Sequence, residues 1–343
     1  MRIIYILFLI LLITKISFSN DIFETNVYEL NFSSNDINLV KEKKINEIKI
    51  KSFKSLIKKL LTDENIKRIK LNDINFVNTF ILNYKIKNEK IINNNYYSKI
   101  KINFNEDLII HYLIENQIQF VDKMPDKFLI IIFEQNNLHN YLFSKENNYY
   151  KFLIKSTNTS FNKYFLIPNL DYNDRFLFNK YHFENDVFQN NNLINKKYKT
   201  EYQILINSIR SKNLIINDVF LFHDNNKYFV TKIPIKNLDY ENLFNNILSS
   251  TLNKWKILNQ IDTSLYSMLE CEISINNIYE LSYVRNLLKS NKWIDNLILK
   301  SIELNKNLYQ ISFIGNIDSF KNSLQKDRLN LFFNNNTCNI KLI

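Results

Sequence analysis

Apolar positions recur along this chain with two different periods, which predicts a mixture of helices and strands. Between Ile37 and Leu61 the apolar residues follow helical spacing and form one stripe, so we expect a long amphipathic helix there. A second long helix is expected over 240–260. Alternating apolar and polar residues instead predict strands at 22–32 and 96–104. The predicted fold class is α+β, or mixed α/β, built from several small modules.

The same patterns divide the chain into four segments, namely 1–19, 20–124, 125–262 and 263–343. Segment 20–124 is expected to follow the order β-α-α-β-β-α. Its hairpin begins with a strand at 76–87, and turn-rich asparagines precede the second strand of the hairpin.

The segment 125–262 opens with an unbroken apolar run, 128–133, which is typical of a strand buried on both faces. Short strands are expected at 150–154 and 164–167, and a helix at 200–212. A turn at 224–226 then joins a pair of strands. The segment is predicted to be an α/β domain.

The segment 263–343 gives the clearest pattern, β-α-β-β-α-β, which is the ferredoxin-like arrangement. Asp318 is expected to cap its second helix. In that topology the first and last strands are antiparallel neighbours, which places Cys271 and Cys338 in one core. We expect a disulfide between them if the protein is exported. The alternative is two buried free thiols.

The first nineteen residues have the features of a secretory signal peptide. Arg2 supplies a basic start, the run 3–13 is apolar, and Ser17 and Ser19 fit the small residues that precede cleavage. We expect cleavage after Ser19 and a periplasmic protein. The alternative is an uncleaved helix that anchors the chain in the inner membrane. No later stretch is apolar enough to span a bilayer, so the mature chain is expected to be soluble.

Composition excludes several classes of site. With one Gly and three Pro, the chain lacks Gly-rich phosphate loops, dinucleotide fingerprints and Gly-x-Ser-x-Gly elbows. The net charge of +11 comes from lysines spread along the chain. It either reflects codon bias or suits an anionic partner. The helix at 41–59 could lie on an anionic membrane surface, or its stripe could pack on its own sheet. Because export is expected, nucleic acid is not.

One short motif offers candidate chemistry. Asp171 and Asp174 follow Pro168 and Leu170, three residues apart. Paired carboxylates can act in acid–base catalysis or bind a hard cation. An Asp in this position more commonly caps a helix or a turn.

Histidines provide a weaker candidate. His182 with Glu184 and Asp186 is the nearest approach to a metal-ligand cluster, and a solvated loop is the simpler interpretation. We expect no metal and no cofactor.

The motif and the C-terminal segment together resemble a known family. The matching stretches are Ile167-Pro168-Asn169-Leu170-Asp171-Tyr172-Asn173-Asp174, Leu281-Ser282-Tyr283-Val284-Arg285 and Ile314-Gly315 through Leu329. The family is an exported proteobacterial group catalogued as a domain of unknown function, number two thousand and sixty-six. The resemblance covers nearly all of the mature chain, and it implies an envelope location and no known catalytic residues.

Two functional hypotheses follow. The first is a non-catalytic envelope protein that binds other envelope proteins through its modules. The second is a small-ligand-binding protein, or an enzyme, that uses Asp171 and Asp174. They differ in one observable: carboxylates that cap a helix through backbone amides favour the first, whereas carboxylates that share a cleft with a His or Lys favour the second.

Overall fold

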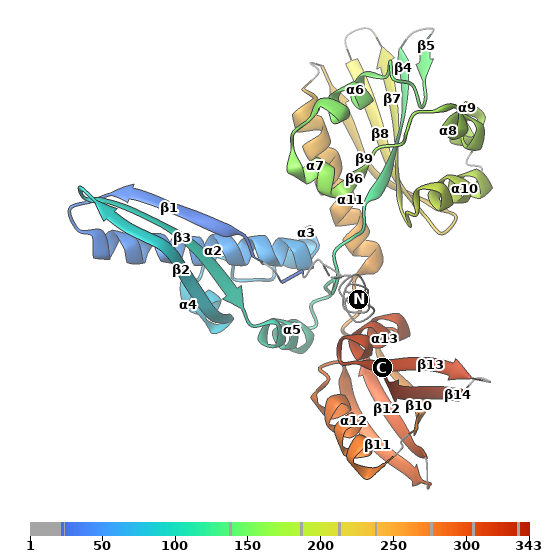
Figure 1. Ribbon diagram of the computed structural model, residues 1–343. Helices are drawn as coiled ribbons and strands as arrows, with labels where there is room; N and C mark the ends of the chain where they lie inside the picture. Colours follow the sequence, from blue (N-terminus) through green and yellow to red (C-terminus); the bar gives the residue numbers. More distant parts are fainter. Residues whose placement is uncertain are drawn as a thin grey trace, which may run out of the picture. The chain divides into compact units, whose positions relative to one another are not determined.

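The computed structural model describes residues 22–23, 25–136, 139–185, 188–211, 214–236, 239–274, 277–303, 306–334 and 337–343. The described chain forms two compact units. Unit 1 contains the residues up to Met124 together with 260–343, and unit 2 contains 125–259. Three separate sheets with their helices make up these units (Figure 1). The predicted mixed α+β class is therefore confirmed.

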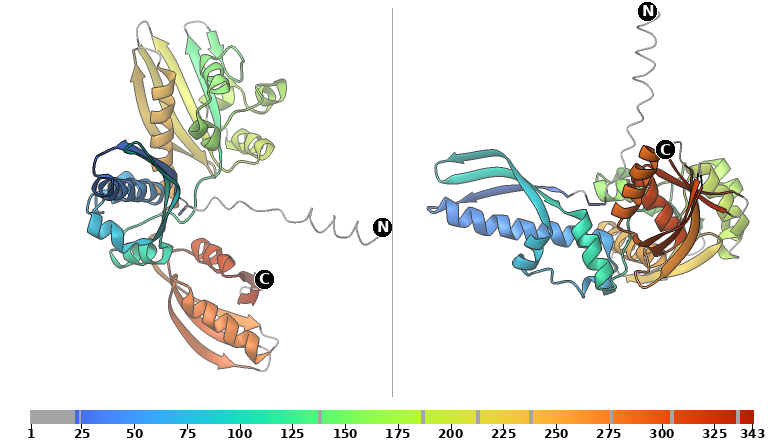
Figure 2. Two further views of the ribbon diagram at one scale, coloured as in Figure 1. Left: turned by 60° about the vertical axis from the view of Figure 1, so that its left-hand side comes forward. Right: turned by 90° about the horizontal axis from the view of Figure 1, so that it is seen from below.

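The N-terminal part of unit 1 is a three-stranded antiparallel sheet with a long helix along one face. Its elements are β1 (Val27–Ser33), α2 (Ile37–Leu60), α3 (Asp63–Ile66), α4 (Ile74–Thr79), β2 (Ile81–Ile92), β3 (Asn95–Phe104) and α5 (Glu106–Glu115). Strand β3 pairs with both β1 and β2. Asp36 starts α2 by accepting the N–H of Leu39, and the predicted apolar stripe is buried against the sheet (Figure 2).

The hairpin of this sheet begins later than its sequence suggests. Residues 76–79 belong to α4 and not to a strand, because Asp73 caps that helix by accepting the N–H groups of Asn75 and Phe76. Strand β2 then extends to Ile92, beyond the predicted end at Lys87.

Unit 2 is a mixed sheet with several short helices and one long helix, and its central strands β4 and β7 are parallel. Its elements are β4 (Phe128–Asn136), β5 (His139–Tyr141), α6 (Asn148–Lys155), α7 (Thr159–Tyr164), β6 (Phe165–Leu166), α8 (Tyr172–Leu177), α9 (Lys180–Glu184), α10 (Phe188–Tyr198), β7 (Gln203–Ser211), β8 (Leu214–His223), β9 (Asn226–Ile235) and α11 (Tyr240–Asn259). The strand order is β5-β4-β7-β8-β9, and β6 also pairs with β4. Residues 128–133 are all buried, as the apolar run predicts.

Two predicted elements of unit 2 are of the wrong type. Residues 150–154 lie in the helix α6. Asn147 caps this helix, and the helix buries Tyr149, Tyr150 and Leu153 on one side. Residues 203–211 form the strand β7 instead of a helix. This strand lies between β4, to which it is parallel, and β8, to which it is antiparallel. Pairing on both sides outweighs the local preference of the segment.

The C-terminal part of unit 1 follows the predicted order and adds one strand. Its elements are β10 (Tyr266–Ser274), α12 (Ile278–Ser290), β11 (Ile294–Ile302), β12 (Lys306–Ile314), α13 (Ile317–Lys326), β13 (Leu329–Asn334) and β14 (Thr337–Leu342). The strand order is β11-β12-β10-β14-β13. The chain ends in a hairpin of β13 and β14 where the pattern has one final strand. The second strand of this hairpin, β14, lies beside β10 and runs parallel to it, so the predicted antiparallel pairing is wrong. Asn316, not Asp318, caps α13.

The first and last parts of unit 1 meet at an apolar contact, and Lys292 also pairs with Glu106 at 2.8 Å. Phe120 and Ile261 form an isolated antiparallel bridge, and the ring of Phe120 stacks on Trp293 with centroids 5.7 Å apart. Gly315 faces Ile261 at this contact. Its φ is +85°, and an added Cβ would come within 2.8 Å of the Ile261 side chain. The predicted segments 20–124 and 263–343 thus carry separate sheets but belong to one unit.

Candidate functional site

The paired carboxylates lie at a tight turn that leads from β6 into α8. Pro168 and Leu170 are buried, and Leu170 has a φ of +59°, a left-handed conformation that costs energy in a residue with a side chain. Asp171 is the N-cap of α8 and accepts the N–H of Asp174 at 2.8 Å. The capping interpretation of Asp171 is therefore confirmed, and the turn needs further partners to hold Leu170 in place.

Asp174 supplies those partners. Its side chain is fully buried, and its Oδ2 accepts the N–H of Leu170 at 2.9 Å. The hydroxyl of Tyr198 lies 2.7 Å from Oδ1 and 2.9 Å from Oδ2, and it also accepts the N–H of Asn169 at 2.7 Å. The Nζ of Lys197 completes the shell at 2.6 Å from Oδ1. Each oxygen of this buried carboxylate thus has two partners, as a buried charge requires.

Lys197 and Tyr198 come from the end of α10, which the chain reaches after two further helices. Lys197 also contacts Asp171 at 3.2 Å. We call Asp171, Asp174, Lys197 and Tyr198 the carboxylate–lysine cluster. It joins the start of α8 to the end of α10, so it fixes how these helices pack.

The pKa shifts in the cluster keep its charges in place. The N–H of Asp174 and the ammonium of Lys197 lower the pKa of Asp171. Burial alone would lower the pKa of Lys197, but its hydrogen bonds to Asp174 and Asp171 outweigh burial and raise it. Burial also raises the pKa of Tyr198 to about 12. Acid–base catalysis near neutral pH requires shifts in the other direction, toward 7.

The histidine candidate is also explained by local structure. The Nδ1 of His182 accepts the N–H of Asn179, and Asn179 accepts the N–H of His182, which together form a capping box at α9. Glu184 pairs with Lys180, and Asp186 lies outside the described residues. Within the described ranges, no group of three His, Cys, Asp or Glu side chains is placed to hold a metal ion.

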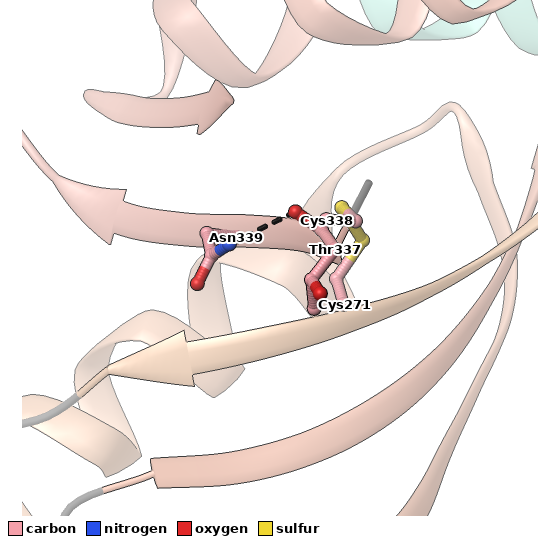
Figure 3. Close-up of a disulfide and its surroundings, with 4 residues drawn as sticks. All are labelled: Cys271, Thr337, Cys338 and Asn339. Carbon is pink, nitrogen blue, oxygen red and sulfur yellow. Dashed lines mark hydrogen bonds between the residues drawn. A yellow bond between two sulfur atoms is a disulfide. The ribbon is translucent and has the colours of Figure 1, made fainter. Parts of the chain in front are cut away.

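The two cysteines form the expected disulfide. Cys271 on β10 lies directly opposite Cys338 on the neighbouring strand β14, with 4.4 Å between their Cα atoms. Both side chains are buried. Figure 3 shows the bridge beside Asn339, whose side chain donates to the carbonyl of Thr337 at 2.9 Å. The bridge links the first strand of this sheet to the last residues of the chain, so it closes the C-terminal part of unit 1.

The structure contains a second buried polar network, which the sequence pattern does not predict. Glu134, at the end of β4, accepts the backbone and side-chain N–H groups of Asn148 at 2.9 Å. Nearby, the hydroxyl of Tyr149 donates to Asn217 at 2.7 Å and contacts Ser208, and burial raises its pKa. The available signal was a carboxylate directly after the apolar run 128–133. Its partners lie on other strands and helices, which local spacing does not reveal.

Ser19 and the rest of the expected signal peptide lie outside the described residues. In the described part of the chain, no helix has both the length and the apolar character needed to cross a bilayer.

Comparison with known proteins adds no assignment. No family model matches the sequence, and no curated protein matches it. The family resemblance based on 167–174 and the C-terminal segment therefore stays a prediction.

Proposed function

We propose that this chain is an exported, non-catalytic envelope protein that binds other envelope proteins. The observation that carries the proposal is the state of the carboxylate–lysine cluster. Asp171 caps a helix, and the oxygens of Asp174 are occupied by backbone, tyrosine and lysine donors. Both carboxylates also contact Lys197, but Asp174 is fully buried and so does not face a cleft. The contacts of these candidate residues therefore serve folding.

Two further features support export and binding. The buried Cys271–Cys338 bridge suits an oxidising compartment such as the periplasm. The sheets are small and separate, and β1 and β2 are edge strands of the N-terminal one. Open edges and separate modules suit recognition of partners, for example by strand addition.

In-cell crosslinking of the tagged protein tests the binding proposal. We expect one reproducible envelope partner by mass spectrometry of the crosslinked material. The intact mass of the recovered protein should correspond to a chain that begins at Asn20, without alkylatable thiols. A chain that keeps residues 1–19 would favour the uncleaved inner-membrane anchor, and two free thiols would contradict export to the periplasm.

A ligand screen with a matched variant tests the alternative. Asp171→Asn removes the charge but keeps a side chain that caps helices well, so the fold is retained. If a metabolite raises the melting temperature of the wild type and not of Asp171→Asn, while crosslinking finds no partner, the non-catalytic proposal is wrong. We expect no such ligand.

A further inference from the structure

Lysines gather on the face of the N-terminal sheet that lies opposite α2. Residues paired directly across antiparallel strands project to the same side of the sheet. Tyr96, Ile100 and Ile102 of β3 are buried on the side of α2. The side away from α2 therefore carries the register pairs Lys85 with Lys101, Lys87 with Lys99, and Lys90 with Tyr97. We call these five lysines the lysine face.

A β-bulge places the last of these lysines on that side. The register shifts between Lys87 and Lys90, and Asn88 adopts a φ of +53° there. Simple alternation would turn Lys90 toward α2, because it is three residues from Lys87. The bulge instead keeps both on one side. It also turns Glu89 toward the helix, where its carboxylate accepts from Lys41 and from the hydroxyl of Tyr96.

The gathering of lysines on one face of the sheet destabilises the fold. Like charges directly opposite each other on neighbouring strands destabilise a sheet, and Lys85–Lys101 and Lys87–Lys99 are two such pairs in succession. The acidic residues in β1, β2 and β3 are Glu29 and Glu89. Glu29 pairs with Lys99 at 2.9 Å, and Glu89 lies on the other side. Lys85, Lys87 and Lys90 therefore place positive charge on this face that a bound anion would offset.

The end of the same hairpin is apolar and exposed. Ile91 and Ile92 are 60% and 56% exposed, and they precede the left-handed turn at Asn93 and Asn94. Tyr97, 40% exposed, lies beside Lys90. A shallow hollow of about 450 Å³ is lined by Lys90, Ile92 and Tyr97 together with residues of β1 that include Glu29. Ile92, opposite Asn95, lies on the side of the lysine face, and Ile91, opposite Tyr96, lies on the side of α2. The end of the hairpin, which Figure 1 shows extending along α2, therefore exposes one aliphatic side chain on each side.

We propose that the lysine face and the hairpin end bind the anionic surface of a phospholipid bilayer. Lysines attract phosphate headgroups, tyrosine favours the interface, and isoleucine side chains enter the boundary of the acyl chains. A soluble polyanion would use the lysines but not Ile91 and Ile92, so the exposed aliphatic residues favour lipid. The apolar stripe of α2, the other candidate for membrane contact, is buried. The proposal goes beyond partner binding and does not depend on it.

Vesicle co-sedimentation of the mature, oxidised protein tests the proposal. Vesicles of phosphatidylcholine alone are compared with vesicles that also contain phosphatidylglycerol. We expect binding to the anionic vesicles, weakened by added salt. Each lysine near an anionic surface contributes about fivefold to the partition coefficient, so Lys85→Gln/Lys87→Gln/Lys90→Gln should lower it on the order of a hundredfold.

A matched triple variant controls for net charge. Lys127, Lys300 and Lys321 are exposed and lie outside the lysine face. Lys127→Gln/Lys300→Gln/Lys321→Gln removes the same charge and should keep most of the binding. Equal loss in both triple variants would overturn the proposal, because binding would then follow net charge alone.

The aliphatic residues separate lipid from other anions. Ile91→Asn/Ile92→Asn should weaken binding to anionic vesicles and leave binding of soluble polyphosphate unchanged. Failure of the wild type to bind anionic vesicles, with or without polyphosphate binding, would overturn the lipid proposal. A crosslinked protein partner found at this face in the absence of vesicle binding would assign the face to that partner instead.

Discussion

In unit 2, Asp174 is buried and both of its oxygens have two donors, whereas in unit 1 Lys85 and Lys87 stand in solvent opposite two further lysines. The first arrangement holds two helices together and the second opposes the pairing of two strands. Charge that is paired and buried is explained by folding. Charge that is exposed and set opposite like charge is not explained by folding, which is why the lysine face, and not the carboxylate motif, is the better candidate for binding.

Removal of Lys197 should break the first arrangement most strongly. Lys197→Met leaves the buried carboxylate of Asp174 without its cation and should lower the free energy of unfolding by about 3 kcal/mol. Urea denaturation measures the loss. Lys196→Met changes the exposed neighbouring lysine and should alter stability by less than about 0.5 kcal/mol. Similar losses in both variants would mean that the cluster does not hold the helices.

Tyr198→Phe should have a smaller effect on the same cluster. It removes one hydrogen bond to a charged group and leaves the N–H of Asn169 without its hydroxyl acceptor, so we expect a loss of about 2 kcal/mol. The hydroxyl alone is deleted, and the ring stays in place. Thermal denaturation of the two proteins side by side gives the difference. An unchanged melting temperature would show that Lys197 suffices for Asp174.

The pH dependence of the cluster follows from the raised pKa of Lys197. A raised folded-state pKa stabilises the protein below the ordinary value of 10.5 and loses that contribution as pH rises through the folded-state value. The difference in unfolding free energy between wild type and Lys197→Met should therefore be constant from pH 6 to 9 and smaller at pH 11. Urea titrations at these pH values test this. A difference that grows above pH 10 would contradict the assignment.

Neutralising lysines in unit 1 should have the smallest effect and the opposite sign. Lys85→Gln/Lys87→Gln removes two like-charge pairs and should raise the free energy of unfolding by about 0.5 kcal/mol. Measurement at low ionic strength is the most sensitive, because salt screens exposed charges. A clear loss of stability would show that these lysines serve the fold, and it would remove the contrast with the carboxylate–lysine cluster.

Much of the fold could be predicted from sequence because periodicity is a local property. The stripe of α2 and the alternation of β3 and β10 are visible without knowledge of their partners. The helix predicted over 200–212 is wrong because the strand β7 depends on β4, which is distant in sequence and supplies the parallel pairing. The direction of β14 was wrong for a related reason, since one additional strand reverses every strand after it.

The candidate site could likewise be predicted only where it depends on residues that are close in sequence. Asp171 as a helix cap could be predicted, because capping involves residues three apart. The partners of Asp174 could not, because Lys197 and Tyr198 reach it from another helix. The lysine face could not be predicted, because simple alternation from Lys87 places Lys90 on the opposite side of the sheet, and only the bulge at Asn88 brings the two lysines to one side.

The contact of Phe120 with Ile261 has a consequence for how the protein reaches its final state. The chain leaves unit 1 and returns to it at nearly the same point, so unit 2 is an insertion in a host fold whose two halves lie at opposite ends of the sequence. Because a chain is synthesised from its N-terminus, the first half of unit 1 is complete before the second half has been made. The Phe120 ring, which is fully buried in the folded protein, is therefore uncovered until Ile261 and Trp293 have been made.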